Sequence, residues 1–166
     1  MNRSLKTLPF LFILTFLIVS AASVSAVEEE KTFPTKYTLI HYAEDKDLDD
    51  MIWRLGGQRL EINRDSVLAS SRVDRLVERV EAILGIWPGE LKINIYLKRG
   101  DMQANNVAYY EYKSRAIFVN VEKVTDGVLA HELAHAIINQ GFNSLLPSKM
   151  QEILTQYVDK YLWSDY

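Results

Sequence analysis

The sequence predicts a single α+β domain in which helices cover a small sheet. Its 166 residues, of which 48% are hydrophobic, are enough for one ordinary domain. Strand-like and helical patterns follow one another in the order strand, two helices, three strands and two helices. The chain has no cysteine, so the domain has to be stabilised by its core or by a bound metal, without disulfides.

The N-terminal residues 1–26 have the layout of a secretory signal peptide. Two basic residues precede the apolar run Leu8 to Val19, and small residues follow up to Ala26. The run is shorter than the roughly 20 residues of a membrane-spanning helix, so we expect cleavage and a secreted or periplasmic protein. An uncleaved signal would instead anchor the protein in a membrane. Residues 27–35 are expected to form a loose leader, and residues 36–166 the folded domain.

The first half of this domain begins with a strand pattern. Residues 37–42 are rich in β-branched and aromatic side chains and predict a strand. Residues 47–55 form a short helical pattern that ends at two glycines. The clearest helix covers residues 66–84, where apolar residues recur every three or four positions until Gly85.

The second half contains three strand patterns and then two helices. Residues 91–97 alternate apolar and polar side chains, which indicates a half-buried strand. Residues 107–112 and 116–121 predict two strands joined as a hairpin. Helices are expected over residues 125–140 and 147–163, and the short turn between them predicts that they run antiparallel.

The first of these late helices contains the sequence His131-Glu132-Leu133-Ala134-His135. Two histidines four residues apart lie on the same helix face and can bind one metal ion. Glu132 is adjacent to a ligand but rotated away from it, which suits action on a bound water. This HExxH pattern is typical of zinc hydrolases, so we expect one Zn²⁺ ion with Glu132 as the general base.

A third ligand is needed, because a catalytic zinc site has three protein ligands and one open position. The absence of cysteine leaves a carboxylate or His41. Glu152 fits best, because antiparallel helices would bring it to about the height of His135. Weaker alternatives are Asp126, Glu122 and Asp159.

Several stretches together resemble the gluzincin metallopeptidases, and most closely the peptidase-MA-like family of small secreted bacterial enzymes. They cover about residues 36–163 and comprise YTLIHY, LKINIYL, AYYEYKSRAIFVNV, HELAHAI and LPSKMQEILTQYV. The resemblance implies a zincin-like domain whose mixed sheet has an antiparallel edge strand. It also implies zinc held by His131, His135 and Glu152, with Glu132 as general base and then acid.

The segment around Glu152 departs from the family pattern. Ile153, Thr155 and Gln156 stand where the family usually has Gly, Ala and an acidic residue. These changes are expected to affect rate and substrate more than metal binding. Gln156 lies one turn after Glu152, so we expect it to accept a hydrogen bond from the free ring nitrogen of His131. The alternative is a solvent-facing helix residue that does not contact the site.

The resemblance also places a substrate-binding edge strand at residues 107–112, with Ala108, Tyr109 and Tyr110 nearest the substrate. Tyr109, Tyr110 and Tyr112 are candidates for a hydroxyl that stabilises the reaction's oxyanion.

These features predict a secreted zinc metallopeptidase that acts on a peptide or protein substrate. The alternatives are a zinc amidase acting on a non-peptide cell-wall amide and an inactive zinc-binding interaction protein. The net charge of −3 gives no reason to expect a nucleic-acid partner.

Overall fold

Five strands and four helices make up the part of the chain that the computed structural model describes, residues 30–56, 62–102 and 105–164. The elements are β1 (Lys31–Pro34), β2 (Thr38–Tyr42), α1 (Asp45–Arg54), α2 (Ile62–Leu84), β3 (Ile93–Lys98), β4 (Ala108–Glu111), β5 (Ala116–Asn120), α3 (Asp126–Gly141) and α4 (Ser148–Tyr161). The predicted signal peptide lies outside the described residues. Within the described ranges, no helix is both long and apolar enough to span a membrane.

The strands form one mixed sheet in the order β1-β2-β3-β5-β4. The three central strands β2, β3 and β5 are parallel, and the edge strands β1 and β4 are antiparallel to their neighbours. The chain passes from β3 to the edge strand β4 and returns through a hairpin to β5. The predicted α+β class and the antiparallel edge strand are therefore confirmed.

The prediction of a loose leader is wrong for its last part. Lys31 to Pro34 form β1 and pair with β2 in a register from Lys31–Tyr42 to Pro34–Leu39. A tight turn joins the two strands, in which the Thr35 N–H donates to the Thr38 carbonyl (2.8 Å). The polar residues that suggested a loose leader are exposed, as is usual on the solvent side of an edge strand, while Phe33 is half-buried and packs against the core.

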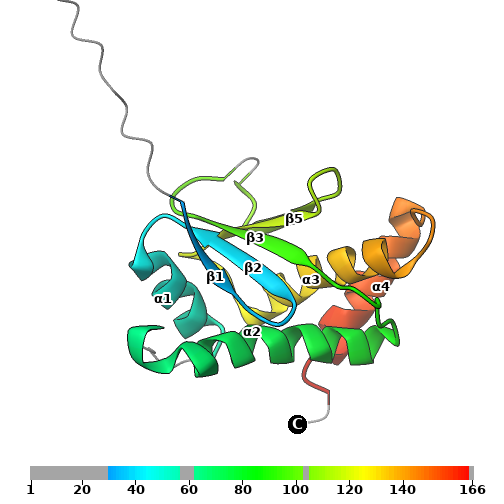
Figure 1. Ribbon diagram of the computed structural model, residues 1–166. Coiled ribbons are helices and arrows are strands. Elements are labelled where there is room, and N and C mark those ends of the chain that lie inside the picture. The colour runs from blue at the N-terminus through cyan, green and yellow to red at the C-terminus, as the bar shows by residue number, and fades with distance from the viewer. Residues whose placement is uncertain (1–29, 57–61, 103–104, 165–166) are drawn as a thin grey trace, which may run out of the picture.

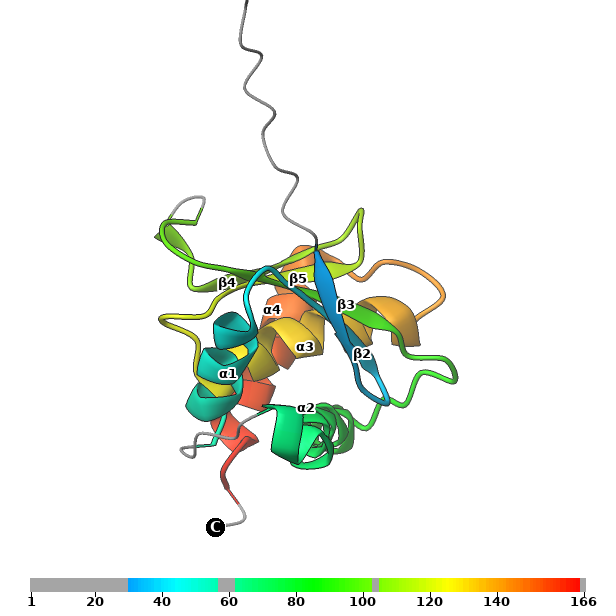
Figure 2. The same ribbon diagram turned by 60° about the vertical axis from the view of Figure 1, so that its left-hand side comes forward.

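All four helices lie on one face of the sheet (Figure 1). Helix α3 is central, because it packs against β4, β5, α2 and α4. Inward-pointing strand residues such as Ile40, Ile95 and Ile117 are fully buried in one core with Leu133 and Ile137 of α3. The main contacts of α3 with the sheet are with β4 and β5, the end of the sheet that Figure 2 shows above α3.

The opposite face of the sheet carries a row of stacked rings. His41, Tyr96, Phe118 and Tyr109 occupy matching positions on β2, β3, β5 and β4. Their ring centroids are 4.2, 5.2 and 5.0 Å apart in that order. Offset stacking of this kind stabilises cross-strand pairs. The row also places His41 on the side of the sheet away from the helices.

The helix boundaries follow the sequence to within a few residues. Helix α2 begins at Ile62, before the predicted start at residue 66, and ends where Gly85 takes a positive φ of 65°. Thr125, the first residue of the predicted helix, caps α3 and accepts a hydrogen bond from the Val128 N–H (3.3 Å). Gly141 is the last residue of α3, and glycine is required there because a Cβ would lie 2.3 Å from the Ile86 side chain.

Candidate metal centre

His131 and His135 of α3 and Glu152 of α4 form the candidate metal centre. One ligand atom from each lies within 4.8 Å of the other two. The Nε2 atoms of His131 and His135 are 4.0 and 3.5 Å from the two oxygens of Glu152. Nitrogen and oxygen ligands of one tetrahedral zinc ion lie about 3.3 Å apart, so these distances are near those of a shared ion. The three residues could therefore hold a metal ion.

The second ring nitrogen of His131 is held by Asp159. Its Nδ1 lies 3.0 Å from Asp159 Oδ2. A carboxylate can only accept, so Nδ1 is the donor, and in the neutral ring the Nε2 lone pair then faces Glu152. The contacts His135–Glu152 and His131–Asp159 run in opposite directions along the two helices, which confirms that α3 and α4 are antiparallel.

The expected contact between Gln156 and His131 is wrong. Gln156 is exposed, and Asp159 takes the place predicted for it. The reason is geometric, because Nδ1 lies on the far side of the His131 ring from the metal-facing Nε2. Its partner therefore has to lie further along α4 than Gln156. Asp159, seven residues after Glu152, returns to nearly the same helix face about two turns away.

His135 is held by a chain of hydrogen bonds from three elements. The Gln151 amide nitrogen donates to the Leu146 carbonyl (2.6 Å), which leaves the Gln151 amide oxygen to accept a short bond from the Tyr112 hydroxyl. Because the Tyr112 hydroxyl donates its single hydrogen bond to Gln151, it acts as the acceptor for His135 Nδ1 at 3.3 Å. The Nε2 lone pair of His135 is therefore also directed at Glu152.

Burial favours the neutral form of the His135 ring. The residue is 8% exposed, and burial together with the neighbouring His131 lowers the pKa of its imidazole. The neutral ring is the form that binds a metal.

Glu132 lies between the ligand group and the edge strand. Its Oε2 accepts a hydrogen bond from the Tyr110 backbone N–H of β4 (2.8 Å). Burial raises the pKa of the Glu132 carboxyl, although His131 and the bond from Tyr110 oppose this. The nearby charges of Glu152 and Asp159 raise it further. Glu132 is therefore placed to accept and release a proton.

Two cavities flank this centre, and both are lined by His131 and Glu132. One, of about 400 Å³, lies between β4 and the start of α4. The other, of about 480 Å³, extends past the N-terminal turn of α3 to Leu162 and Trp163. Sequence patterns did not predict Leu162 or Trp163, because both follow α4 and are brought to α3 only by the fold.

The three tyrosines proposed as oxyanion donors have other contacts. The Tyr110 hydroxyl accepts a hydrogen bond from Asn139 (2.7 Å), and the Tyr112 hydroxyl belongs to the chain that holds His135. The ring of Tyr109 stacks on Phe118. Tyr112 is thus a positioning residue.

The alternative third ligands lie elsewhere or have another partner. His41 contacts Asn94 Oδ1 (3.1 Å) on the outer face of the sheet, away from α3. Glu122 contacts Arg99, and Asp126 is the first residue of α3, five positions before His131. Of the four alternatives, only Asp159 touches the group, and it does so through Nδ1 of His131.

Comparisons with protein-family models, with curated proteins and with solved structures gave no match. The chemistry of this centre is therefore inferred from its own geometry.

Proposed function

We propose that the protein is a secreted zinc metallopeptidase of the gluzincin type, with a zincin-like fold. One observation carries the proposal: one ring nitrogen from each of two imidazoles and the carboxylate of Glu152 converge beside the half-buried Glu132. Three protein ligands leave one position for water or substrate, which is typical of catalytic rather than structural zinc.

The donor set supports zinc in particular. Two imidazole nitrogens and one carboxylate suit zinc, whereas magnesium and calcium prefer oxygen ligands alone. The hydrogen bonds from Nδ1 of His131 to Asp159 and from Nδ1 of His135 to Tyr112 are the outer partners that zinc-binding histidines usually have. When bound, zinc would lower the pKa of a water molecule and polarise the substrate carbonyl.

Glu132 would carry the proton during hydrolysis. The Tyr110 N–H occupies its Oε2 and fixes the carboxylate, so Oε1 is the oxygen for proton transfer. Its carboxylate would hold the proton taken from the attacking water until the leaving amine accepts it.

The free edge of β4 would bind the peptide. The Val107 carbonyl accepts from the Asn120 N–H of β5 (2.8 Å), so Val107 points its backbone groups into the sheet. Backbone groups alternate along an antiparallel edge, so Ala108 and Tyr110 point theirs outward. The Tyr110 N–H is used by Glu132, which leaves the backbone of Ala108 and the carbonyl of Tyr110 for an extended substrate.

Turnover of a peptide mixture tests the proposal. The protein is purified, loaded with one equivalent of zinc and incubated with the mixture, and products are identified by mass spectrometry. We expect cleavage that a chelator abolishes and added zinc restores. If the zinc-loaded protein leaves every peptide intact, the peptidase proposal fails. Release of fragments from cell-wall material would then favour the amidase.

A further inference from the structure

A third cavity, of about 600 Å³, lies next to the candidate metal centre and is lined by three arginines of α2: Arg72, Arg75 and Arg79. The spacing of three and four residues places them on one face of the helix. The other walls come from the end of α1, from Asp126 of α3, and from Leu162 and Trp163 after α4. We call this the arginine cavity.

The arginine charges are only partly balanced by the acids around them. Glu78 also lines the cavity, but its carboxylate is bound by Lys36 Nζ (3.0 Å) and by the Tyr37 hydroxyl (3.1 Å). Asp126 is the other acid, and its Oδ1 is buried without a hydrogen bond among the described residues. The cavity therefore has an excess of positive charge.

Two of the guanidinium groups retain donors for a ligand. Arg72 Nη1 donates to the Ile52 carbonyl (3.4 Å), and Arg75 Nε donates to the Ser71 carbonyl (3.2 Å). These are the hydrogen bonds that either side chain makes within the described part of the chain, and a guanidinium has five N–H groups. Arg79 has a structural task, because it donates to the Tyr161 and Leu162 carbonyls at the end of α4.

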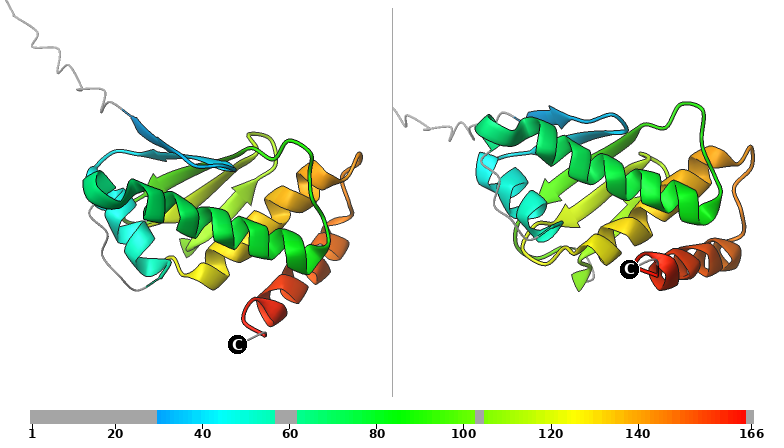
Figure 3. Two further views of the ribbon diagram at one scale, coloured as in Figure 1. Left: turned by 60° about the horizontal axis from the view of Figure 1, so that its bottom comes forward. Right: turned by 90° about the horizontal axis from the view of Figure 1, so that it is seen from below.

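The arginine cavity adjoins the 480 Å³ cavity beside the metal centre. Leu162 and Trp163 line both this cavity and the 480 Å³ cavity that contains His131 and Glu132. Figure 3 shows α2 beside the start of α3 and the end of α4. Asp126 lies about 7.5 Å along α3 from His131. An extended peptide advances about 3.3 Å per residue, so two or three residues span this distance.

We propose that Arg72 and Arg75 bind a carboxylate of the substrate, two or three residues from the bond that is cleaved. This inference rests on the proposed peptidase function and narrows its substrates to peptides with an acid on one side of that bond. The planar guanidinium fork matches a carboxylate with two parallel hydrogen bonds. The carboxylate could belong to the C-terminus of the peptide or to an Asp or Glu side chain.

Three matched, fluorescently labelled alanine-rich peptides distinguish these sources. One is uncharged with an amidated C-terminus, one has a free C-terminal carboxylate, and one is amidated but contains glutamate at successive positions. Binding is measured by fluorescence anisotropy on the zinc-loaded Glu132→Gln variant, which would leave the peptides intact. We expect at least one acid-bearing peptide to bind about tenfold or more tightly than the uncharged one, with a preference that weakens as salt increases.

Arginine substitutions in the same protein test the assignment. Arg75→Gln should remove the preference, and Arg72→Gln should reduce it. Arg54→Gln is the matched control, because it removes the same charge from α1 where the side chain lies over the Trp53 ring (5.8 Å). Melting temperatures confirm that each variant is folded. The control should keep the preference of the parent protein.

The possible outcomes separate the two proposals. Equal affinity for all peptides, no binding of any of them, or an unchanged preference in Arg75→Gln would overturn the carboxylate site. If the wild-type protein cleaves peptides with and without an acidic group equally well, the carboxylate site is rejected and the peptidase proposal is kept. Binding that depends on Arg75, in a zinc-loaded wild-type protein that cleaves nothing, would retain the carboxylate site and reject the peptidase.

Discussion

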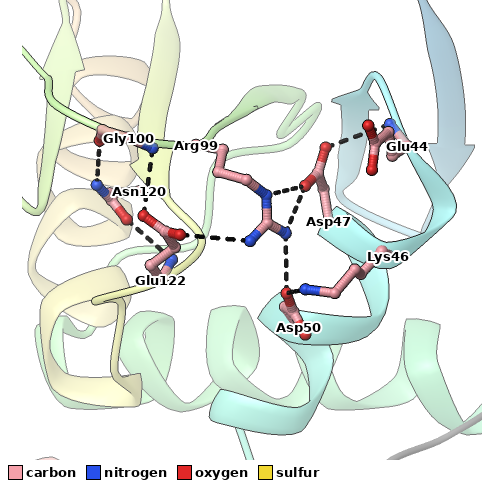
Figure 4. Close-up of polar contacts among 8 residues, drawn as sticks. All are labelled: Glu44, Lys46, Asp47, Asp50, Arg99, Gly100, Asn120 and Glu122. Atoms are coloured by element: carbon pink, nitrogen blue, oxygen red, sulfur yellow. Dashed lines mark hydrogen bonds and ion pairs between the residues drawn. The ribbon is translucent and has the colours of Figure 1, made fainter.

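Two regions of the molecule bring ionisable side chains together, and they differ in whether the group contains its own cation. We call the first the Arg99 cluster, formed by Arg99, Asp47, Asp50 and Glu122 (Figure 4). Arg99 donates to Asp47 at 2.7 and 3.0 Å and to Asp50 at 2.8 Å, with Glu122 at 3.5 Å. In the candidate metal centre, the ring nitrogens and the Glu152 oxygens face one another at 3.5 and 4.0 Å.

The difference lies in the source of the positive charge. The Arg99 cluster contains its own cation, and its acids accept normal hydrogen bonds from that cation. Because Asp47 and Asp50 belong to α1, these bonds join α1 to the loop after β3. In the metal centre, the two Nε2 atoms of neutral imidazoles and a carboxylate would all be acceptors, so they could not satisfy one another. Their proton donors, on Nδ1, are directed outward to Asp159 and Tyr112. Such a set is suited to an external cation.

The largest effect is expected at Glu132. Glu132→Gln keeps the size of the side chain but removes the proton acceptor. Peptide hydrolysis should fall by about 10²- to 10⁴-fold while the bound zinc, measured by elemental analysis, stays at the wild-type level. An activity close to that of the wild type would remove Glu132 from the chemistry.

Glu152 should matter for binding of the metal. Glu152→Gln should lower zinc affinity by more than the 10- to 100-fold that is typical of losing an outer partner, because a direct ligand is lost. Glu122→Gln is the matched control from the Arg99 cluster and should bind zinc like the wild type. Competition titration with a coloured chelator measures both. Equal affinity in the two variants would mean that Glu152 is not a ligand.

Asp159 should have a smaller effect through His131. Asp159→Asn removes the negative charge next to Nδ1 and should lower zinc affinity or activity by about 10- to 100-fold. Gln156→Ala, on the same helix but exposed, should leave both unchanged. If Gln156→Ala is the more damaging substitution, the zinc-bound protein must use the contact expected from the sequence.

The sequence predicted those parts of the fold that depend on local spacing. HExxH fixes two histidines on one face of α3 whatever surrounds them, and the short turn between α3 and α4 places Glu152 opposite His135. The strand and helix patterns gave most elements within a few residues. β1 was missed because an exposed edge strand needs no apolar pattern, so its pairing with β2 cannot be read from its own residues.

The contacts that hold the ligands could not be predicted in this way. The choice of Asp159 over Gln156 depends on where Nδ1 of His131 points in the packed structure. Tyr112 and Gln151, which hold His135, come from the β4–β5 hairpin and from α4. The Arg99 cluster joins residues more than 20 positions apart. None of these contacts leaves a periodic pattern in the sequence.

The smallest effect in this series concerns stability in the Arg99 cluster. Arg99→Gln would leave the Asp47 side chain, only 8% exposed, without its ionic partner. We expect unfolding at neutral pH to become easier by about 1–3 kcal/mol. Zinc or a chelator should not change this difference, because the cluster contains its own cation. Lys98→Gln, which removes a neighbouring exposed charge, is the control and should have little effect.

The same variant should alter the pH dependence of unfolding. Hydrogen bonds from Lys46 and Arg99 lower the pKa of Asp50 in the folded protein below its ordinary value of 3.8. A lowered folded-state pKa contributes stability above the unfolded-state pKa, and this contribution is lost as the pH falls through the folded-state value. Arg99→Gln removes one of the two bonds. The difference in the free energy of unfolding between wild type and variant should therefore be largest at neutral pH and should narrow below about pH 4. Urea unfolding midpoints measured from neutral pH down to the acid limit of the native state test this expectation. A difference that stays constant or widens with acid would show that Arg99 stabilises the protein by packing rather than by pairing with ionised carboxylates.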